Sequence, residues 1–248
     1  MKLLQWAFVT GADRGVGLSL VKGLLGQGYH VFAGQYAGAG NTGAGSELER
    51  LEELSEGRLK RVPLDISDAD SVSRALKTVA AVTDRLDILI NNGAILGDMQ
   101  ATIEDELDFE EIDQVFRVNA LGALRMSNGL IQPLLRSEHK LIVNISSEAG
   151  SIGSCWRNAW YAYCMSKAAL NMQSHLIHNQ IAPKGGKVMV IHPGHVQTYM
   201  QGKLDTAGKL TPDESAESIL KLVEQRLDSG YAGEGLALID YAGETLPW

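Results

Sequence analysis

Short apolar runs alternate with amphipathic stretches along most of this chain of 248 residues. Such runs, bounded by polar or glycine-rich segments, are typical of buried strands, and apolar residues at a spacing of three and four indicate helices. The expected strands are 6–9, 29–33, 59–64, 86–90, 140–145, 187–191 and 236–239. The expected helices are 15–25, 46–54, 68–82, 106–135, 159–181 and 213–227.

Seven strands interleaved with helices predict a doubly wound α/β fold, with a seven-stranded parallel sheet and helices on both faces. Leu141, Ile142 and Val143 are continuously apolar, which fits a strand buried on both faces, as parallel strands are. Neither a second core nor an internal repeat is visible, so residues 1–248 are expected to form a single domain. The long helical stretch 106–135 is expected to stop near Pro133.

The balance of charges narrows the choice of partners. The chain carries 22 Lys and Arg against 30 Asp and Glu, a formal charge of −8, and its pI is near 5.3. Each phosphate contact needs a cation, so this balance disfavours a nucleic-acid partner and an anionic membrane surface. Two cysteines, Cys155 and Cys164, are too few for a disulfide framework. Without a run of about 18 apolar residues or a secretory leader, a cytoplasmic protein with no membrane partner is expected.

Glycine is concentrated near the amino terminus, where 11 of the 27 glycines lie between Gly11 and Gly45. Residues 10–17, Thr-Gly-Ala-Asp-Arg-Gly-Val-Gly, follow the first expected strand and open the first expected helix. Glycines there allow a tight turn and a close approach to a pyrophosphate, for which the helix N-terminus offers free N–H groups. The motif predicts a dinucleotide-binding turn, with an ordinary glycine turn as the alternative. Backbone N–H groups of the loop 38–45 are a further possible source of phosphate contacts.

Tyr163 and Lys167 lie one helical turn apart on the same face of the expected helix 159–181. A nearby ammonium favours the phenolate, so Lys167 is expected to lower the pKa of Tyr163 from about 10 and make it a workable proton donor or acceptor. Tyr161 competes for this role, but the residue four positions beyond it is Met165, which carries no charge. Taken alone the spacing is weak, because most such pairs are ordinary surface pairs.

Together these motifs resemble the short-chain dehydrogenase/reductase family over essentially the whole chain. The family's Thr-Gly-x-x-x-Gly-x-Gly motif matches residues 10–17, and its Tyr-x-x-x-Lys motif matches 163–167. Its catalytic serine matches Ser147, after the fifth expected strand, and its helix asparagine matches Asn119. The chain looks closest to the carbonyl-reductase-like branch that includes the sniffer and C-factor proteins.

The resemblance implies a Rossmann-type fold and an NAD(P)-dependent oxidoreductase that transfers a hydride between nicotinamide and a small carbonyl or alcohol substrate. Tyr163 would be the acid/base, Ser147 would hold the substrate oxygen, Lys167 would also hold the nicotinamide ribose, and Asn119 would keep a water in a proton relay. The implied cofactor-binding residues are Gly11, Arg14, Gly15, Val16, Gly17, Asp65, Ile66, Asn92, Gly93, Tyr163, Lys167, Pro193, Gly194, Val196 and Thr198. No metal site is expected, because no metal-ligand spacing occurs.

Two departures from the family pattern bear on the cofactor. Where the family usually has Asn-Asn-Ala-Gly, this chain has Asn-Asn-Gly-Ala at 91–94, which leaves small residues for close approach. The second strand ends without an acid for an NAD ribose or an arginine for an NADP phosphate. Arg14 is the remaining candidate for the 2′-phosphate, since a guanidinium suits that group, although a solvated loop cation is the alternative. NADP(H) is therefore favoured and NAD(H) stays possible.

Substrate specificity is expected to lie in residues 95–103, 148–160 and 196–212. The last of these is either a mobile lid over the substrate or a plain surface loop. The candidates for an apolar substrate wall, with ordinary packing as the alternative, are Trp156, Trp160, Tyr199 and Met200. A homodimer or homotetramer is expected through helices 106–135 and 159–181, as in the family. A cofactor-binding sensor or signalling protein with little turnover is the alternative function.

Overall fold

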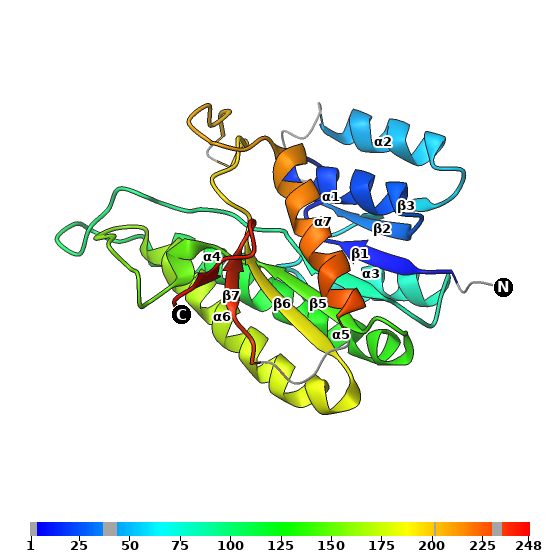
Figure 1. Cartoon of the computed structure of the whole chain (residues 1–248). Helices are drawn as coiled ribbons and strands as arrows, with labels where there is room; N and C mark the ends of the chain where they lie inside the picture. Colours follow the sequence, from blue (N-terminus) through cyan, green and yellow to red (C-terminus); the bar gives the residue numbers. More distant parts are fainter. Residues whose placement is uncertain (1–3, 37–43, 201, 230–234) are drawn as a thin grey trace.

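The computed structural model describes residues 4–36, 44–200, 202–229 and 235–248. Within them, one eight-stranded sheet has the order β3-β2-β1-β4-β5-β6-β7-β8, and helices lie on both of its faces (Figure 1). The strands are β1 (Trp6–Val9), β2 (His30–Gln35), β3 (Leu59–Pro63), β4 (Ile88–Asn91), β5 (Leu141–Ile145), β6 (Lys187–His192), β7 (Leu238–Asp240) and β8 (Thr245–Leu246). The first seven pair in parallel, and β8 runs antiparallel to β7.

The helices follow the amphipathic stretches of the sequence. They are α1 (Gly15–Gly26), α2 (Ala44–Leu54), α3 (Ala69–Ala80), α4 (Phe109–Phe116), α5 (Ala123–Arg136), α6 (Tyr161–Ile181) and α7 (Pro212–Asp228). A π-helical segment, η1 (Arg117–Gly122), joins α4 to α5, and short 3-10 turns are η2 (Glu148–Gly150) and η3 (Ala182–Lys184). Local chemistry fixes the start of α7. The Thr211 and Glu214 side chains form a capping box there, and Pro212 is the first helical residue.

The predicted fold class and its seven parallel strands are confirmed, and the structure adds the two-residue β8. The predicted single helix 106–135 is divided into α4, η1 and α5, and α5 ends at Arg136, within one turn of the predicted stop near Pro133. A proline removes one backbone donor without forbidding the turn that follows it. The Pro133 carbonyl accepts a hydrogen bond from the Leu86 backbone N–H (3.1 Å), which ties α5 to the loop before β4.

Two apolar layers enclose the sheet. One contains α1, α7 and Leu48 of α2, packed on side chains such as Ala7 and Val9 of β1. The other contains α3, α5 and the end of α6, packed on Phe8 of β1 and Phe32 of β2. Neighbouring residues of β1 thus point to opposite layers, which explains why its four residues are all apolar. No helix within the described residues is both long and apolar enough to cross a membrane.

Strand order reverses between β1 and β4, since β1 pairs with β2 on one side and with β4 on the other. Ligands of open α/β sheets bind at the carboxyl ends of the strands where the order reverses. This places the predicted site beyond Val9 and Asn91, at the start of α1. Of the loop 38–45, residues 38–43 lie outside the described residues, and 44 and 45 begin α2.

Candidate active site

The glycine turn between β1 and α1 is tightly packed on itself. Gly11 and Gly15 have φ angles of +61° and +55°, which side chains rarely adopt. A Cβ on Gly17 would lie 2.0 Å from the Gly11 carbonyl oxygen, and a Cβ on Gly11 would lie 2.8 Å from Gly93 Cα. Three glycines therefore let the turn, the first turn of α1 and the loop after β4 meet. Val16, beside them, is buried in the core.

Hydrogen bonds join this turn to the loop after β4. The Thr10 hydroxyl oxygen accepts from the backbone N–H groups of Asn92 and Gly93, both at 3.0 Å. The Asn92 side-chain amide donates to the carbonyls of Thr10 and Gly11, also at 3.0 Å. A Cβ on Gly93 would lie 3.1 Å from Ile66 Cδ1, a tight but adjustable contact. Glycine in place of the family's alanine therefore leaves the floor of the site open.

Arg14 lies at the N-terminus of α1 with an extended backbone, φ −163°. Its side chain is 56% exposed, and its Nε is 3.8 Å from the Asp13 carboxylate. At that distance the ion pair is loose, and the guanidinium can reach a further anion. Asp65, half-buried after β3, accepts hydrogen bonds from the backbone N–H and hydroxyl of Ser67.

Ser147, Tyr163 and Lys167 converge at the carboxyl end of β5. Ser147 follows the strand and precedes η2, and its hydroxyl shares a side-chain hydrogen bond with Tyr163 of α6. The Lys167 ammonium donates to the Ile145 carbonyl at 2.8 Å and lies 5.6 Å from the centre of the Tyr163 ring. All three are buried. Tyr161, by contrast, is only half-buried at the first position of α6.

Burial sets the protonation of this group. It raises the pKa of Tyr163 to about 12, although the hydrogen bond from Ser147 opposes the rise. It lowers the pKa of Lys167 to about 7. The expected lowering of the Tyr163 pKa by Lys167 is thus not observed, because a low-dielectric site disfavours the phenolate and the ammonium alike. Tyr163 is a neutral phenol at neutral pH.

Asn119 lies within the π-helical segment η1, and such segments are frequent at functional sites. Its side-chain oxygen accepts from the Ile95 backbone N–H and its amide donates to the Ile95 carbonyl, both at 2.8 Å. The amide also donates to the Ser166 hydroxyl at 3.0 Å, and that hydroxyl donates to the Tyr163 carbonyl at 2.8 Å. Asn119 therefore links the loop after β4 to the helix that carries Tyr163.

The segment after β6 faces the glycine turn. The Pro193 carbonyl accepts from the Ser215 hydroxyl of α7 at 2.7 Å, and Gly194 has a φ of +84°. Val196 forms a β-bridge with Leu210, which closes the following loop on itself. A Cβ on Gly15 would lie 3.6 Å from the Thr198 methyl group, so this segment borders the turn.

Two residues that the sequence analysis does not single out, Glu148 and Arg157, form a two-armed ion pair beside Ser147. They lie nine positions apart across a loop without a recognisable motif, so no sequence signal identifies the pair.

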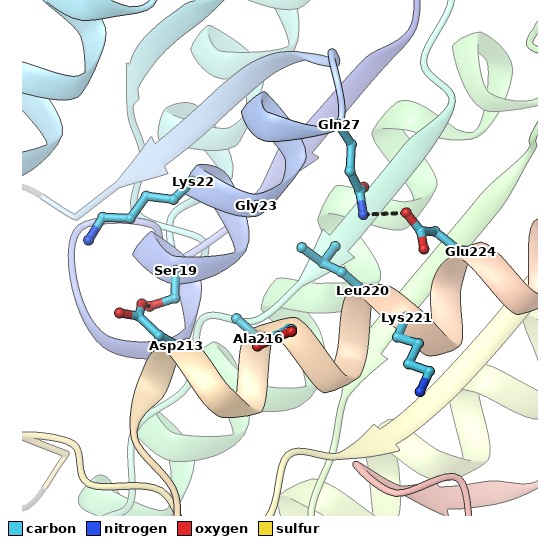
Figure 2. Close-up of a pocket in the computed structure, with 10 residues that line it drawn as sticks. Ser19, Lys22, Gly23, Gln27, Asp213, Ala216, Leu220, Lys221 and Glu224 are labelled. Carbon is cyan, nitrogen blue, oxygen red and sulfur yellow. Dashed lines mark hydrogen bonds between the residues drawn. The ribbon is translucent and has the colours of Figure 1, made fainter.

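A groove of about 710 Å³ lies elsewhere, between α1 and α7, and is bridged by a hydrogen bond from Gln27 to Glu224 (Figure 2). None of the predicted site residues lines it.

Fold and motif positions define a dehydrogenase-type α/β protein, and a family model described as short chain dehydrogenase matches residues 5–208. The chain belongs to the short-chain dehydrogenase family of oxidoreductases. It is 31% identical over 166 residues to the C-signal protein of Myxococcus xanthus, covering 67% of this chain and 95% of that one.

Two solved structures share its fold over nearly the whole chain. The NADPH-bound carbonyl reductase from chicken fatty liver is 29% identical, with a TM-score of 0.84 and 99% coverage of both chains. The carbonyl reductase Sniffer of D. melanogaster is 23% identical, with a TM-score of 0.84 and coverage of 99% of this chain and all of the other, which shows the shared fold alone. The family model confirms the predicted family, and the similarities to C-signal and to the chicken carbonyl reductase agree with the predicted branch.

Proposed function

We propose that this protein is an NADP(H)-dependent reductase that converts a carbonyl group of a small organic substrate to an alcohol. The convergence of Ser147, Tyr163 and Lys167 at the end of β5, beside the glycine turn, carries the proposal. The turn fits a dinucleotide because Gly11, Gly15 and Gly17 leave its backbone without side chains, so that a pyrophosphate can approach it closely. The N-terminus of α1 adds N–H groups for a phosphate.

When bound, the nicotinamide supplies the hydride, which is the difficult part of the chemistry. The Ser147 hydroxyl donates a hydrogen bond to the substrate oxygen and fixes its position. Tyr163 Oη then donates its proton to that oxygen. A phenol with a pKa of about 12 is protonated at neutral pH, which suits proton donation and thus reduction.

Lys167 and Asn119 support this proton transfer. With a pKa of about 7, the Lys167 amine exchanges protons readily at neutral pH. It would also hold the ribose of a bound nicotinamide half. Asn119 keeps a water between Lys167 and the solvent, completing a relay that restores the Tyr163 proton. Asp65, Ile66, Pro193, Gly194, Val196 and Thr198 complete the cofactor contacts.

The preference for NADP(H) over NAD(H) rests on Arg14. Its exposed guanidinium at the start of α1 suits the 2′-phosphate, and a relative with the same fold binds NADPH. Arg14→Ala is expected to raise the dissociation constant for NADPH at least tenfold and that for NADH less than twofold, because only NADPH carries the phosphate. Isothermal titration with both cofactors measures this, and equal effects on the two would contradict the assignment.

A sensor or signalling protein with the same cofactor and little turnover is the alternative, favoured by the similarity to C-signal. The assay that separates them follows NADPH oxidation with aldehydes, ketones and quinones. A sensor binds NADPH and oxidises none of it, whereas the proposed reductase turns over at least one of these classes.

We also propose a homodimer or homotetramer. Leu121 and Leu124 are exposed on η1 and α5, and Met165, Met172 and Leu176 are exposed on α6. The Gln173 side chain donates to the Ala120 carbonyl (3.2 Å), so these elements lie side by side and their apolar side chains form one face.

We further propose that the loop 196–212 acts as a lid over the substrate. We also propose that the protein is located in the cytoplasm.

A further inference from the structure

The loop between Ser147 and Tyr163 is closed by an ion pair. The two terminal nitrogens of the Arg157 guanidinium donate to the two carboxylate oxygens of Glu148, at 2.9 and 2.6 Å. The Arg157 side chain is only 9% exposed, while that of Glu148 is 38% exposed. A bidentate ion pair with a buried guanidinium holds the backbone at Glu148 and at Arg157 in a fixed relative position, whereas an exposed ion pair does not. Glu148 directly follows Ser147, so the pair fixes the segment that carries the serine.

The Arg157 guanidinium also lies between two indole rings. Its central carbon is 4.6 Å from the centre of the Trp156 ring and 4.8 Å from that of Trp160. The Trp160 ring in turn meets the Tyr163 ring edge-on, with centroids 6.2 Å apart and an interplanar angle of 71°. An uninterrupted series of contacts therefore runs from Glu148 through Arg157 and Trp160 to Tyr163.

The backbone of Trp160 shows that these contacts impose a conformation. Its φ and ψ of 66° and 33° lie in the left-handed region, which is strained for a residue other than glycine and persists only where the surroundings enforce it. Trp160 directly precedes α6, and its carbonyl accepts from the Cys164 N–H at 2.9 Å. The conformation of Trp160 thus determines how α6 begins, three residues before Tyr163.

We propose that Arg157 is a positioning residue for the reaction: paired with Glu148 and stacked on Trp160, it holds the Tyr163 hydroxyl in register with Ser147 and offsets the charge of Glu148 at the phenol. This inference rests on the proposed role of Tyr163. Lysine cannot replace arginine here, because it lacks both the planar fork and the flat face.

The charges around Tyr163 agree with this role. Glu148 raises the pKa of the phenol and Arg157 lowers it, so the two act in opposite directions. The other titratable groups near this cluster are Cys155 in the same loop, Cys164 and Lys167 on α6, His192 at the end of β6, which faces Glu148 and Arg157, and Asp240 of β7, which faces His192. From α4, the Glu111 carboxylate is engaged by the Asp98 backbone N–H at 2.7 Å.

Arg157→Met and Glu148→Gln test the proposal together, because both break the same ion pair. In the proposed mechanism alcohol oxidation needs the phenolate, so its rate is expected to rise with pH. This rise should move to higher pH in Arg157→Met and to lower pH in Glu148→Gln. If the Glu148–Arg157 ion pair had only a structural role, the pH at which the rate rises would move in the same direction in both variants, or would not move. We expect kcat to fall at least tenfold in Arg157→Met, with the KM for NADPH within twofold of wild type.

Arg157→Lys keeps the positive charge but lacks the planar, bidentate guanidinium. It serves as the second variant if Arg157→Met does not fold. Its pH profile should match wild type while its kcat falls, because the charge remains and the stacking is lost. Arg61→Met is the control, since it breaks another arginine–carboxylate cluster, with Glu52 and Glu49, on the β3 side of the sheet. Wild-type values in Arg61→Met are expected, and a wild-type kcat in both Arg157 variants would overturn the proposal.

A measurement without turnover separates this proposal from the proposed function. Ultraviolet difference titration of each variant against the same variant carrying Tyr163→Phe reports the ionisation of that phenol alone. Opposite displacements in Arg157→Met and Glu148→Gln support the inference, and equal displacements overturn it. If wild type reduces no carbonyl compound, the proposed function fails, and this titration still decides whether Arg157 and Glu148 govern Tyr163.

Discussion

At the scale of single residues, burial rather than spacing decides the chemistry of the site. Tyr163 and Lys167 stand one helical turn apart, as their positions in the sequence predict, and both are buried. The sequence suggests that the ammonium lowers the pKa of the phenol. In the structure burial instead shifts the pKa of each group toward its neutral form, because it removes the water that would stabilise either charge. The depth of burial depends on tertiary packing, which a helical spacing does not contain.

This burial makes stability depend on pH through Lys167. Its pKa is about 7 when folded against 10.5 for the free side chain, so between these values the unfolded chain binds more protons and stability rises with pH. We expect the free energy of unfolding of wild type, minus that of Lys167→Met, to increase by roughly 1 kcal/mol per pH unit from pH 7.5 to 9.5. Urea unfolding measures it, and a constant difference would contradict the burial of the amine.

At the scale of elements, the turn between β1 and α1 was predictable because its glycines follow a strand and open a helix. Gly17 is the most demanding of them, since a Cβ there would meet the Gly11 carbonyl oxygen at 2.0 Å. Gly17→Ala is expected to destabilise the fold by about 1–3 kcal/mol and to weaken NADPH binding, since the turn must open. Gly26→Ala, on the same helix with no atom within 4 Å of the added carbon, should stay within about 1 kcal/mol of wild type. Thermal unfolding compares the two, and equal losses would contradict the packing described.

Other elements carry no local signal. The π-helical segment at Asn119 and the passage of α5 beyond Pro133 lie inside one continuous amphipathic stretch, whose periodicity predicts a single helix. The pairing of Glu148 with Arg157 joins two loop positions that only the fold brings together. Strand β8 has two residues, too few for a pattern. Motifs that directly follow a strand were therefore predictable from the sequence, whereas contacts between distant positions of a loop were not.

At the scale of the whole molecule, the exposed apolar side chains of η1, α5 and α6 form the proposed interface between subunits. A charge placed on this face should separate the subunits, because an interface core excludes unpaired charges. We expect Leu124→Glu to reduce the mass in light scattering to that of one chain. Leu54→Glu, at an exposed position of α2, is the control and should keep the wild-type mass. A wild type that is already a single chain would contradict the proposal.

The order of the sheet brings the parts of the site together, since β1, β4, β5 and β6 end beside one another and carry the glycine turn, Asn92, Ser147 and Pro193. The alternation of strands and helices indicates a parallel, doubly wound sheet without giving this order, which is why the class of the protein was predictable from its sequence. The substrate was not, because the three segments expected to contact it follow no motif.

The most direct test of the account is the NADPH-dependent reduction of carbonyl compounds by wild type, Tyr163→Phe and Tyr161→Phe. Removing a general acid typically costs about 10²–10⁴ in rate. We predict a loss of this size in kcat for Tyr163→Phe, with the NADPH dissociation constant within twofold of wild type, and near-normal turnover for Tyr161→Phe. Retention of most of the rate by Tyr163→Phe would contradict the central claim that its phenol donates the proton.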